Sequence, residues 1–147
     1  MGAREEEAMS RLFVSTDQNL IDFAWLHRTL EAEYWGWEYT KEKVQENAAA
    51  ALCFGIYERF EASEDIIQLG FARVITDKVS FSFICDVVVD ADYRRAGIGT
   101  KLMECIVAHP DVKKTITILG TKQAWLFYEK FGFGPCAQAM MQKSPLK

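Results

Sequence analysis

The chain has 147 residues, of which 50% are hydrophobic and 26% are charged, and its formal net charge is −4. This length and composition predict one globular domain at residues 11–147, preceded by a disordered tail at residues 1–10. The acidic balance argues against a nucleic-acid partner, because such binding depends on clustered positive charge. No apolar run reaches the roughly 20 residues of a membrane span, so we expect no membrane partner.

The four cysteines, Cys53, Cys85, Cys105 and Cys136, are widely spaced and include no C-x-x-C pair. This spacing predicts reduced core thiols rather than a disulfide framework or a zinc site, and we expect no metal. The N-terminus also lacks the apolar segment of a signal peptide. We therefore expect a cytoplasmic protein, either a monomer or a homodimer.

The first half of the chain predicts a strand, two helices and a second strand. Residues 12–14 are a short apolar run, and residues 19–30 carry apolar side chains at the i, i+3, i+4 spacing of a helix. Gly36 and its aromatic neighbours interrupt that helix, and Thr40 is the predicted N-cap of the next one. Residues 52–57 then predict a strand.

The second half predicts a hairpin followed by alternating helices and strands. The resulting order, β-α-α-β-β-β-α-β-α-β, places antiparallel strands before a β-α-β crossover. It predicts an α/β fold in which helices cover one mixed sheet. The expected elements are a hairpin of residues 66–75 and 81–89, a helix at 98–108, a strand at 115–119, a helix at 122–131 and a last strand at 133–142.

A glycine-rich turn connects the strand at 81–89 to the helix at 98–108. Glycines allow a sharp turn and a close approach to a ligand, and the first N–H groups of a helix attract anions. The spacing fits neither the P-loop nor the dinucleotide fingerprint. We predict a site for a phosphate-bearing ligand, with a tight turn and solvated arginines as the alternative. Its residues are Arg94, Arg95, Ala96, Gly97, Ile98, Gly99 and Thr100.

Two motifs resemble those of the GNAT superfamily of N-acetyltransferases. Arg94-x-x-Gly97-x-Gly99 resembles the R/Q-x-x-G-x-G/A loop that wraps the pyrophosphate of coenzyme A in that family, and residues 124–133 resemble its motif A-x-x-x-Y-E-K-x-G-F. The resemblance covers roughly residues 67–135. It implies a fold in which the fourth and fifth strands splay apart, with acetyl-CoA bound in the gap as co-substrate.

The resemblance also implies further coenzyme contacts. Val87 and Val89 occupy the strand that pairs with the pantetheine arm, and the N–H of Val87 faces the thioester carbonyl; core packing of both side chains is compatible with this role. Thr121 replaces an asparagine that many members carry, and we expect its hydroxyl to contact the arm. In the second motif the expected contacts are Ala124, Phe127 and Lys130.

Two residues are candidates for catalysis. The resemblance makes Tyr128 the general acid that protonates the departing thiolate, the alternative being an ordinary buried tyrosine. Asp86 is a charge in an otherwise apolar strand, so it needs a cation or a cleft. We expect it either to face the acceptor amine or to form an intramolecular salt bridge. Cys85 stands where polyamine acetyltransferases carry a catalytic glutamate, so a water chain is the alternative route for the amine proton.

Tyr34, Trp35 and Trp37 lie between the first two helices, where this fold often forms the acceptor pocket. Aromatic rings there suit stacking or a cation, and packing onto the sheet is the alternative. The resemblance implies an N-acetyltransferase acting in a ternary complex on a primary amine, and we expect a small-molecule acceptor. The alternatives are a non-catalytic acyl-CoA sensor and a partner-binding module on the same fold.

Overall fold

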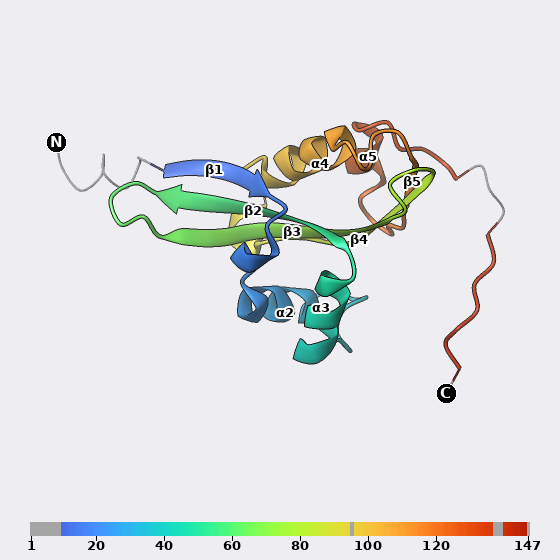
Figure 1. Cartoon of the computed structure of the whole chain (residues 1–147), viewed down its shortest axis with the longest axis horizontal. Helices are drawn as coiled ribbons and strands as arrows, with labels where there is room; N and C mark the ends of the chain where they lie inside the picture. Colours follow the sequence, from blue (N-terminus) through green and yellow to red (C-terminus); the bar gives the residue numbers. More distant parts are fainter. Residues whose placement is uncertain (1–9, 95, 137–139, 147) are drawn as a thin grey trace.

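Five strands form one sheet in the order β1-β2-β3-β4-β5, with helices on both faces (Figure 1). The computed structural model describes residues 10–94, 96–136 and 140–146. The first four strands pair antiparallel and β5 pairs parallel to β4, which confirms the mixed sheet. The elements are β1 (Ser10–Ser15), the 3-10 turn η1 (Gln18–Leu20), α2 (Phe23–Glu31), α3 (Lys41–Ala49), β2 (Leu52–Phe60), β3 (Ile66–Thr76), β4 (Phe81–Val89), the 3-10 turn η2 (Ala91–Tyr93), α4 (Ile98–Ala108), β5 (Ile116–Leu119) and α5 (Trp125–Glu129).

Side-chain caps set the start of the first two helices. The carboxylate of Asp22 accepts a hydrogen bond from the N–H of Trp25, so α2 begins four residues later than the predicted start at residue 19. The hydroxyl of Thr40 accepts from the N–H of Lys43, which confirms Thr40 as the N-cap of α3. These local bonds fix where the loop between α2 and α3 begins and ends.

The sheet is buried on both faces. Helix α4 covers one face, where Leu102 and Ile106 pack in a cluster with Phe54 of β2. Helices α2 and α3 cover the other face, where Leu26 packs in a second cluster with Cys53. Neighbouring residues of one strand therefore belong to different clusters, as the alternation of side chains along a strand requires.

The main difference from the predicted elements lies at the C-terminal end. The prediction of a last strand at 133–142 is wrong for residues 133–136 and 140–142, which form no strand, and 137–139 lie outside the described residues. Pro135 has no N–H to donate to a ladder, and Gly134 has no side chain to pack on a sheet. Phe133 packs against the α4-side cluster instead.

Other differences concern the ends of elements. β1 begins at Ser10, so that residue is not part of a disordered tail, and residues 1–9 lie outside the described residues. β2 continues to Phe60 because residues 58–60 pair with β1, and Glu58 and Arg59 also pair with β3. α5 is shorter than the predicted helix at 122–131.

β4 carries a bulge and then diverges from β5. Between two regular pairs, Ala72 of β3 faces both Asp86 and Val87 of β4. Asp86 has a left-handed φ of 55°, a conformation that Asp tolerates better than most residues. The last pair between β4 and β5 is Ile84 with Leu119. The rest of β4 therefore continues without a β5 partner, as the family resemblance implies.

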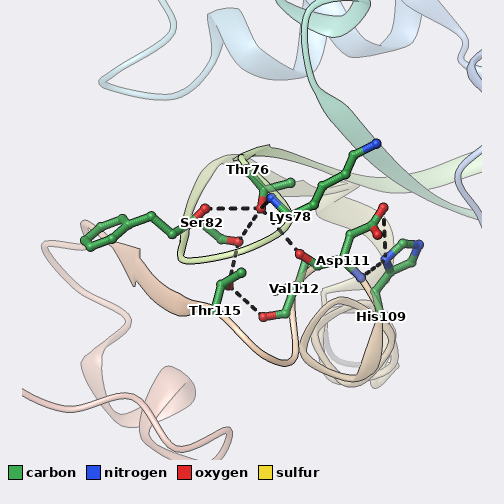
Figure 2. Close-up of polar contacts among 8 residues, drawn as sticks. Thr76, Lys78, Ser82, His109, Asp111, Val112 and Thr115 are labelled. Carbon is green, nitrogen blue, oxygen red and sulfur yellow. Dashed lines mark hydrogen bonds and ion pairs between the residues drawn. The ribbon is translucent and has the colours of Figure 1, made fainter.

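A chain of hydroxyl groups joins β3 and β4 to the start of β5 (Figure 2). The hydroxyl of Ser82 donates to Thr76 Oγ1 at 2.8 Å and lies 2.7 Å from Thr115 Oγ1. Thr76 donates to the carbonyl of Phe81, and Thr115 donates to the carbonyl of Val112. Since Ser82 is only 1% exposed, these partners replace water for a buried hydroxyl. The chain holds β4 and β5 together where their pairing begins.

Replacing Ser82 with alanine is expected to lower the free energy of unfolding by about 1–3 kcal/mol, because the half-buried hydroxyls of Thr76 and Thr115 each lose a hydrogen bond worth about 0.5–1.5 kcal/mol. Urea denaturation followed by circular dichroism measures this change. Ser80→Ala, in the exposed turn before β4, is the matched control and should change the stability by less than about 0.5 kcal/mol. Equal effects of the two substitutions would contradict the role of the hydroxyl chain.

Candidate active site

A cavity of about 700 Å³ opens where β4 and β5 diverge. Its walls come from β4, from the segment between β5 and α5, and from the loop between α2 and α3. Residues that are distant in sequence therefore meet at one site. The sequence-predicted residues that line it are Tyr34, Trp35, Asp86, Val87, Thr121, Ala124 and Tyr128.

Several other predicted residues lie outside the lining of this cavity. Trp37 is 65% exposed, so no contact with the cavity supports its predicted role. Val89 and Phe127 pack against the α4-side cluster. Lys130 is exposed, and its Nζ lies 5.9 Å from the centre of the Phe127 ring. Arg95 lies outside the described residues.

The glycine-rich turn forms the N-terminal end of α4. Gly97 is the N-cap residue, has a left-handed φ of 76° and makes no side-chain cap. The N–H groups of the first helical turn, from Ile98 to Thr100, have no partner within the helix and point toward its open end. A Cβ at Gly99 would lie 3.3 Å from Phe127 Cζ, so the glycine lets α5 pack on this first turn. The turn therefore offers backbone donors to an anion.

Arg94 connects this turn to the cavity. Its Nη2 lies 3.2 Å from Glu33 Oε1. Glu33 follows α2 and lines the cavity, whereas the side chain of Arg94 is 58% exposed. The predicted phosphate loop and the predicted acceptor loop are thus in direct contact.

Asp86 forms the intramolecular salt bridge that the sequence left open. Its Oδ2 accepts a hydrogen bond from Arg73 Nε at 2.8 Å, and its Oδ1 lies 3.5 Å from the hydroxyl of Tyr39. The Asp86 side chain is 4% exposed. Burial alone would lower the pKa of Arg73, but the hydrogen bond and charge of Asp86 outweigh it and raise that pKa. All three residues line the cavity.

Tyr128 lies on α5 with its ring among other aromatic rings. It packs edge-on to Phe127 at 5.1 Å and to Phe133 at 6.1 Å between ring centres. Burial raises the pKa of Tyr128, and a charge on Tyr34 would raise it further. The phenol is therefore neutral at physiological pH and carries a proton that it can donate.

Thr121 lies where two cavities meet. Its Oγ1 accepts a hydrogen bond from the N–H of Ala124 at 3.0 Å, which stabilises the turn before α5. A second cavity of about 560 Å³ runs along β5 toward residues 131–136 and shares Leu119, Thr121 and Tyr128 with the first. A ligand in the first cavity is consequently within reach of both hydroxyl groups.

The cysteines are not equally buried. Cys53 is in the core, whereas Cys85 and Cys105 are half-buried and Cys136 is exposed, so the prediction of core thiols is wrong for Cys136. Cys85 lines the cavity. Burial raises the pKa of its thiol to about 11, with the charge of Arg73 opposing that shift. A neutral thiol is a poor nucleophile.

Sequence reasoning missed several cavity residues, among them Glu33, Tyr39 and Arg73, which make polar contacts at the site. Arg73 carried a usable signal, because it is the one charged residue of β3 and Asp86 is the one charged residue of β4. Two lone charges in the strands of a predicted hairpin are candidates to pair. Glu33 and Tyr39 flank the aromatic cluster and gave no comparable signal.

Two kinds of feature are absent from the part of the chain that the structure describes. No group of three or more His, Cys, Asp or Glu side chains is arranged to hold a metal ion. None of the described helices has both the length and the apolar character needed to cross a membrane.

A comparison of the sequence with models of protein families identifies the family of this chain. A family model described as an acetyltransferase (GNAT) domain matches residues 49–135, which is more than half of the chain. The chain belongs to the GNAT family. Both motifs, at 94–99 and 124–133, fall within the matched residues. Acetyl-CoA is the co-substrate used by this family.

Individual proteins named as acetyltransferases resemble the chain over most of its length. A crystal structure from Xanthomonas campestris, described as belonging to the GNAT family, has a TM-score of 0.80 and 32% identity, and the match covers 92% of this chain and 94% of that one. A Gibberella zeae protein named as an acetyltransferase is 23% identical over 81% of this chain and 77% of its own. Glucosamine-6-phosphate N-acetyltransferase from Arabidopsis thaliana shares the fold, with a TM-score of 0.56 and 19% identity over 90% of this chain and 98% of that one.

Proposed function

We propose that this GNAT protein is an N-acetyltransferase that moves an acetyl group from acetyl-CoA to a primary amine of a small molecule. The observation that carries the proposal is the cavity at the divergence of β4 and β5, which Val87 and Tyr128 both line. Its volume of about 700 Å³ lies within the usual range for small-molecule sites. A small acceptor therefore suits it.

The residues present fit acetyl-CoA. Gly97 has no side chain that caps α4, so the N–H groups at the start of this helix are available to a pyrophosphate. β4 continues past its last pair with β5, which leaves backbone groups of β4 for an amide-containing arm. Thr121, Ala124 and Tyr128 form the opposite wall of the same gap.

When bound, acetyl-CoA supplies a thioester whose carbonyl carbon the acceptor amine attacks, so that a C–N bond forms and the C–S bond breaks. Val87 lies at the bulge, outside the regular pairing of β3 and β4. Its N–H donates to the carbonyl oxygen as negative charge develops there. Tyr128 gives its phenolic proton to the departing sulfur. Holding both substrates together makes the attack effectively unimolecular, and the cysteines take no part.

The amine must also lose a proton. Asp86 accepts from Arg73 through Oδ2, and its other acceptor, Oδ1, lies 3.5 Å from the hydroxyl of Tyr39 on the cavity wall. We assign Asp86 to orienting the amine, with water carrying the proton away. This assignment agrees with the absence of a glutamate at Cys85, where polyamine acetyltransferases carry their base.

A thermal-unfolding titration with acetyl-CoA, coenzyme A and ATP tests the proposal. Ligand at 100 times its dissociation constant stabilises a protein by about 2.7 kcal/mol, which is a shift of several degrees for a domain of this size. We expect both coenzyme A species to shift the midpoint and ATP to leave it unchanged. No shift with any ligand would support the partner-binding alternative instead.

A pair of glycine variants makes the titration specific for the loop. Gly97→Ala forces a side chain into a left-handed conformation and should reduce the shift that acetyl-CoA causes. Gly134→Ala places a Cβ in open space and should preserve the shift. Equal shifts in the two variants would contradict binding at the start of α4.

A further inference from the structure

An ion pair attaches the loop between α2 and α3 to the phosphate loop. Glu33 and Arg94 are 3.2 Å apart, and their side chains are 23% and 58% exposed. Exposed pairs of this kind are weak, whereas a charge-assisted bond from Arg to a phosphate is strong. A phosphate bound at the start of α4 would therefore compete successfully with Glu33 for Arg94.

Tyr34, the residue next to Glu33, has the ammonium group of Lys122 over its ring. Lys122 Nζ lies 4.4 Å from the centre of the Tyr34 ring, and Tyr34 packs edge-on to Trp35 at 5.0 Å. The cavity is lined by all four of these residues: Glu33, Tyr34, Trp35 and Lys122. An aromatic face beside a carboxylate is an arrangement that binds a cationic amine.

Only one acidic side chain at the cavity can be released without leaving a buried charge. Among the described residues that line it, the carboxylates are Glu33 and Asp86. Asp86 is 4% exposed and bound to Arg73, whose side chain is 13% exposed, so separating that pair is costly. Glu33 faces the cavity with a partner that is largely in solvent, so it can exchange that partner for another cation.

We infer that Glu33 and the ring of Tyr34 form the site at which a cationic acceptor amine first binds, before Asp86 orients it for attack. Arg94 occupies Glu33 until the co-substrate phosphate displaces it, and the amine replaces Lys122 Nζ on the ring of Tyr34. The inference rests on the proposed function, because the competing phosphate belongs to acetyl-CoA. It deepens that function by assigning Glu33 as the residue that selects an acceptor carrying positive charge.

We expect Glu33→Gln to strengthen the binding of acetyl-CoA and to weaken the binding of a cationic acceptor. Without the carboxylate, Arg94 is released, so acetyl-CoA should bind roughly two- to fivefold more tightly. The acceptor site loses its negative charge, so the KM for phenethylamine, a cationic probe, should rise while that for aniline, a neutral probe, stays unchanged. A general loss of structure would weaken both substrates together and cannot produce this pattern.

Calorimetry on the full chain measures the first change, and initial rates at saturating acetyl-CoA measure the second. Glu38→Gln makes the same chemical change on the same loop outside the cavity lining, and it should alter neither value. In an Arg94→Gln background, Glu33→Gln should no longer tighten acetyl-CoA binding, because the competition is absent.

The outcomes separate the inference from the proposed function. If the unaltered chain binds acetyl-CoA but Glu33→Gln weakens that binding or leaves it unchanged, the inference is overturned and the proposed function stands. If the unaltered chain does not bind acetyl-CoA, both fail. A rise in the KM for aniline equal to that for phenethylamine would also overturn the charge-based site.

Discussion

Tyr128→Phe is expected to reduce turnover by about a hundredfold or more, the usual scale for loss of a general acid, while acetyl-CoA affinity stays the same. The phenyl ring keeps the packing with Phe127 and Phe133, so the variant removes one proton donor and little else. Because burial raises the pKa of Tyr128, the donor remains protonated at neutral pH. Its loss by titration should therefore lower activity only above about pH 10.

Steady-state kinetics with any accepted amine, combined with calorimetry for acetyl-CoA, measures both quantities. Tyr57→Phe is the matched control, because it removes the same atom from a tyrosine of β2 that lies outside the cavity lining. Among the described residues, the Tyr57 hydroxyl is buried without a hydrogen-bond partner, so its removal should not reduce stability. Unchanged turnover in Tyr128→Phe would exclude the acid role.

Arg73→Met is expected to lower the free energy of unfolding by about 3–5 kcal/mol, the cost of breaking a buried ion pair on one side. The pair joins β3 to β4 at 2.8 Å, and Asp86 is left with an unpaired charge at 4% exposure. Urea denaturation at pH 7 measures the loss. The control is the double variant Arg73→Met/Asp86→Asn, in which the orphaned charge is also removed.

The double variant should recover much of the lost stability, because asparagine tolerates the left-handed backbone at Asp86 and carries no charge. If the single and double variants are equally unstable, the loss comes from packing of the Arg73 stem rather than from the charge. The same double variant tests the assignment of Asp86, since it should raise the KM for the amine without changing acetyl-CoA affinity.

Features that depend on neighbours in the chain were predictable. The cap at Thr40, the hairpin strands and the helix after the glycine turn each arise from a local pattern of apolar spacing, capping or turn residues. Gly97 adopts the left-handed conformation that a glycine in such a turn permits. The family follows from these same local patterns, because both motifs are contiguous.

The prediction of a last strand was wrong because it relied on apolar side chains alone, the same local signal that identified the other strands. Residues 133–142 contain enough apolar side chains to resemble a strand, but a strand forms only where a neighbour accepts its hydrogen bonds. Pro135 has no N–H to contribute. Apolar composition alone therefore does not determine whether a segment joins a sheet.

Several members of the candidate site were predictable from the sequence, but Glu33, Tyr39 and the contacts between members were not. Asp86 was predicted from its lone charge and Tyr128 from its motif. The pairing of Asp86 with Arg73 depends on the register of β3 on β4. The contact between Glu33 and Arg94 joins two residues that are 61 positions apart in the chain. Sequence periodicity reports which face of an element is apolar. Which polar groups meet depends on how those faces are packed, and that is settled by the balance of burial and hydrogen bonding over the whole molecule.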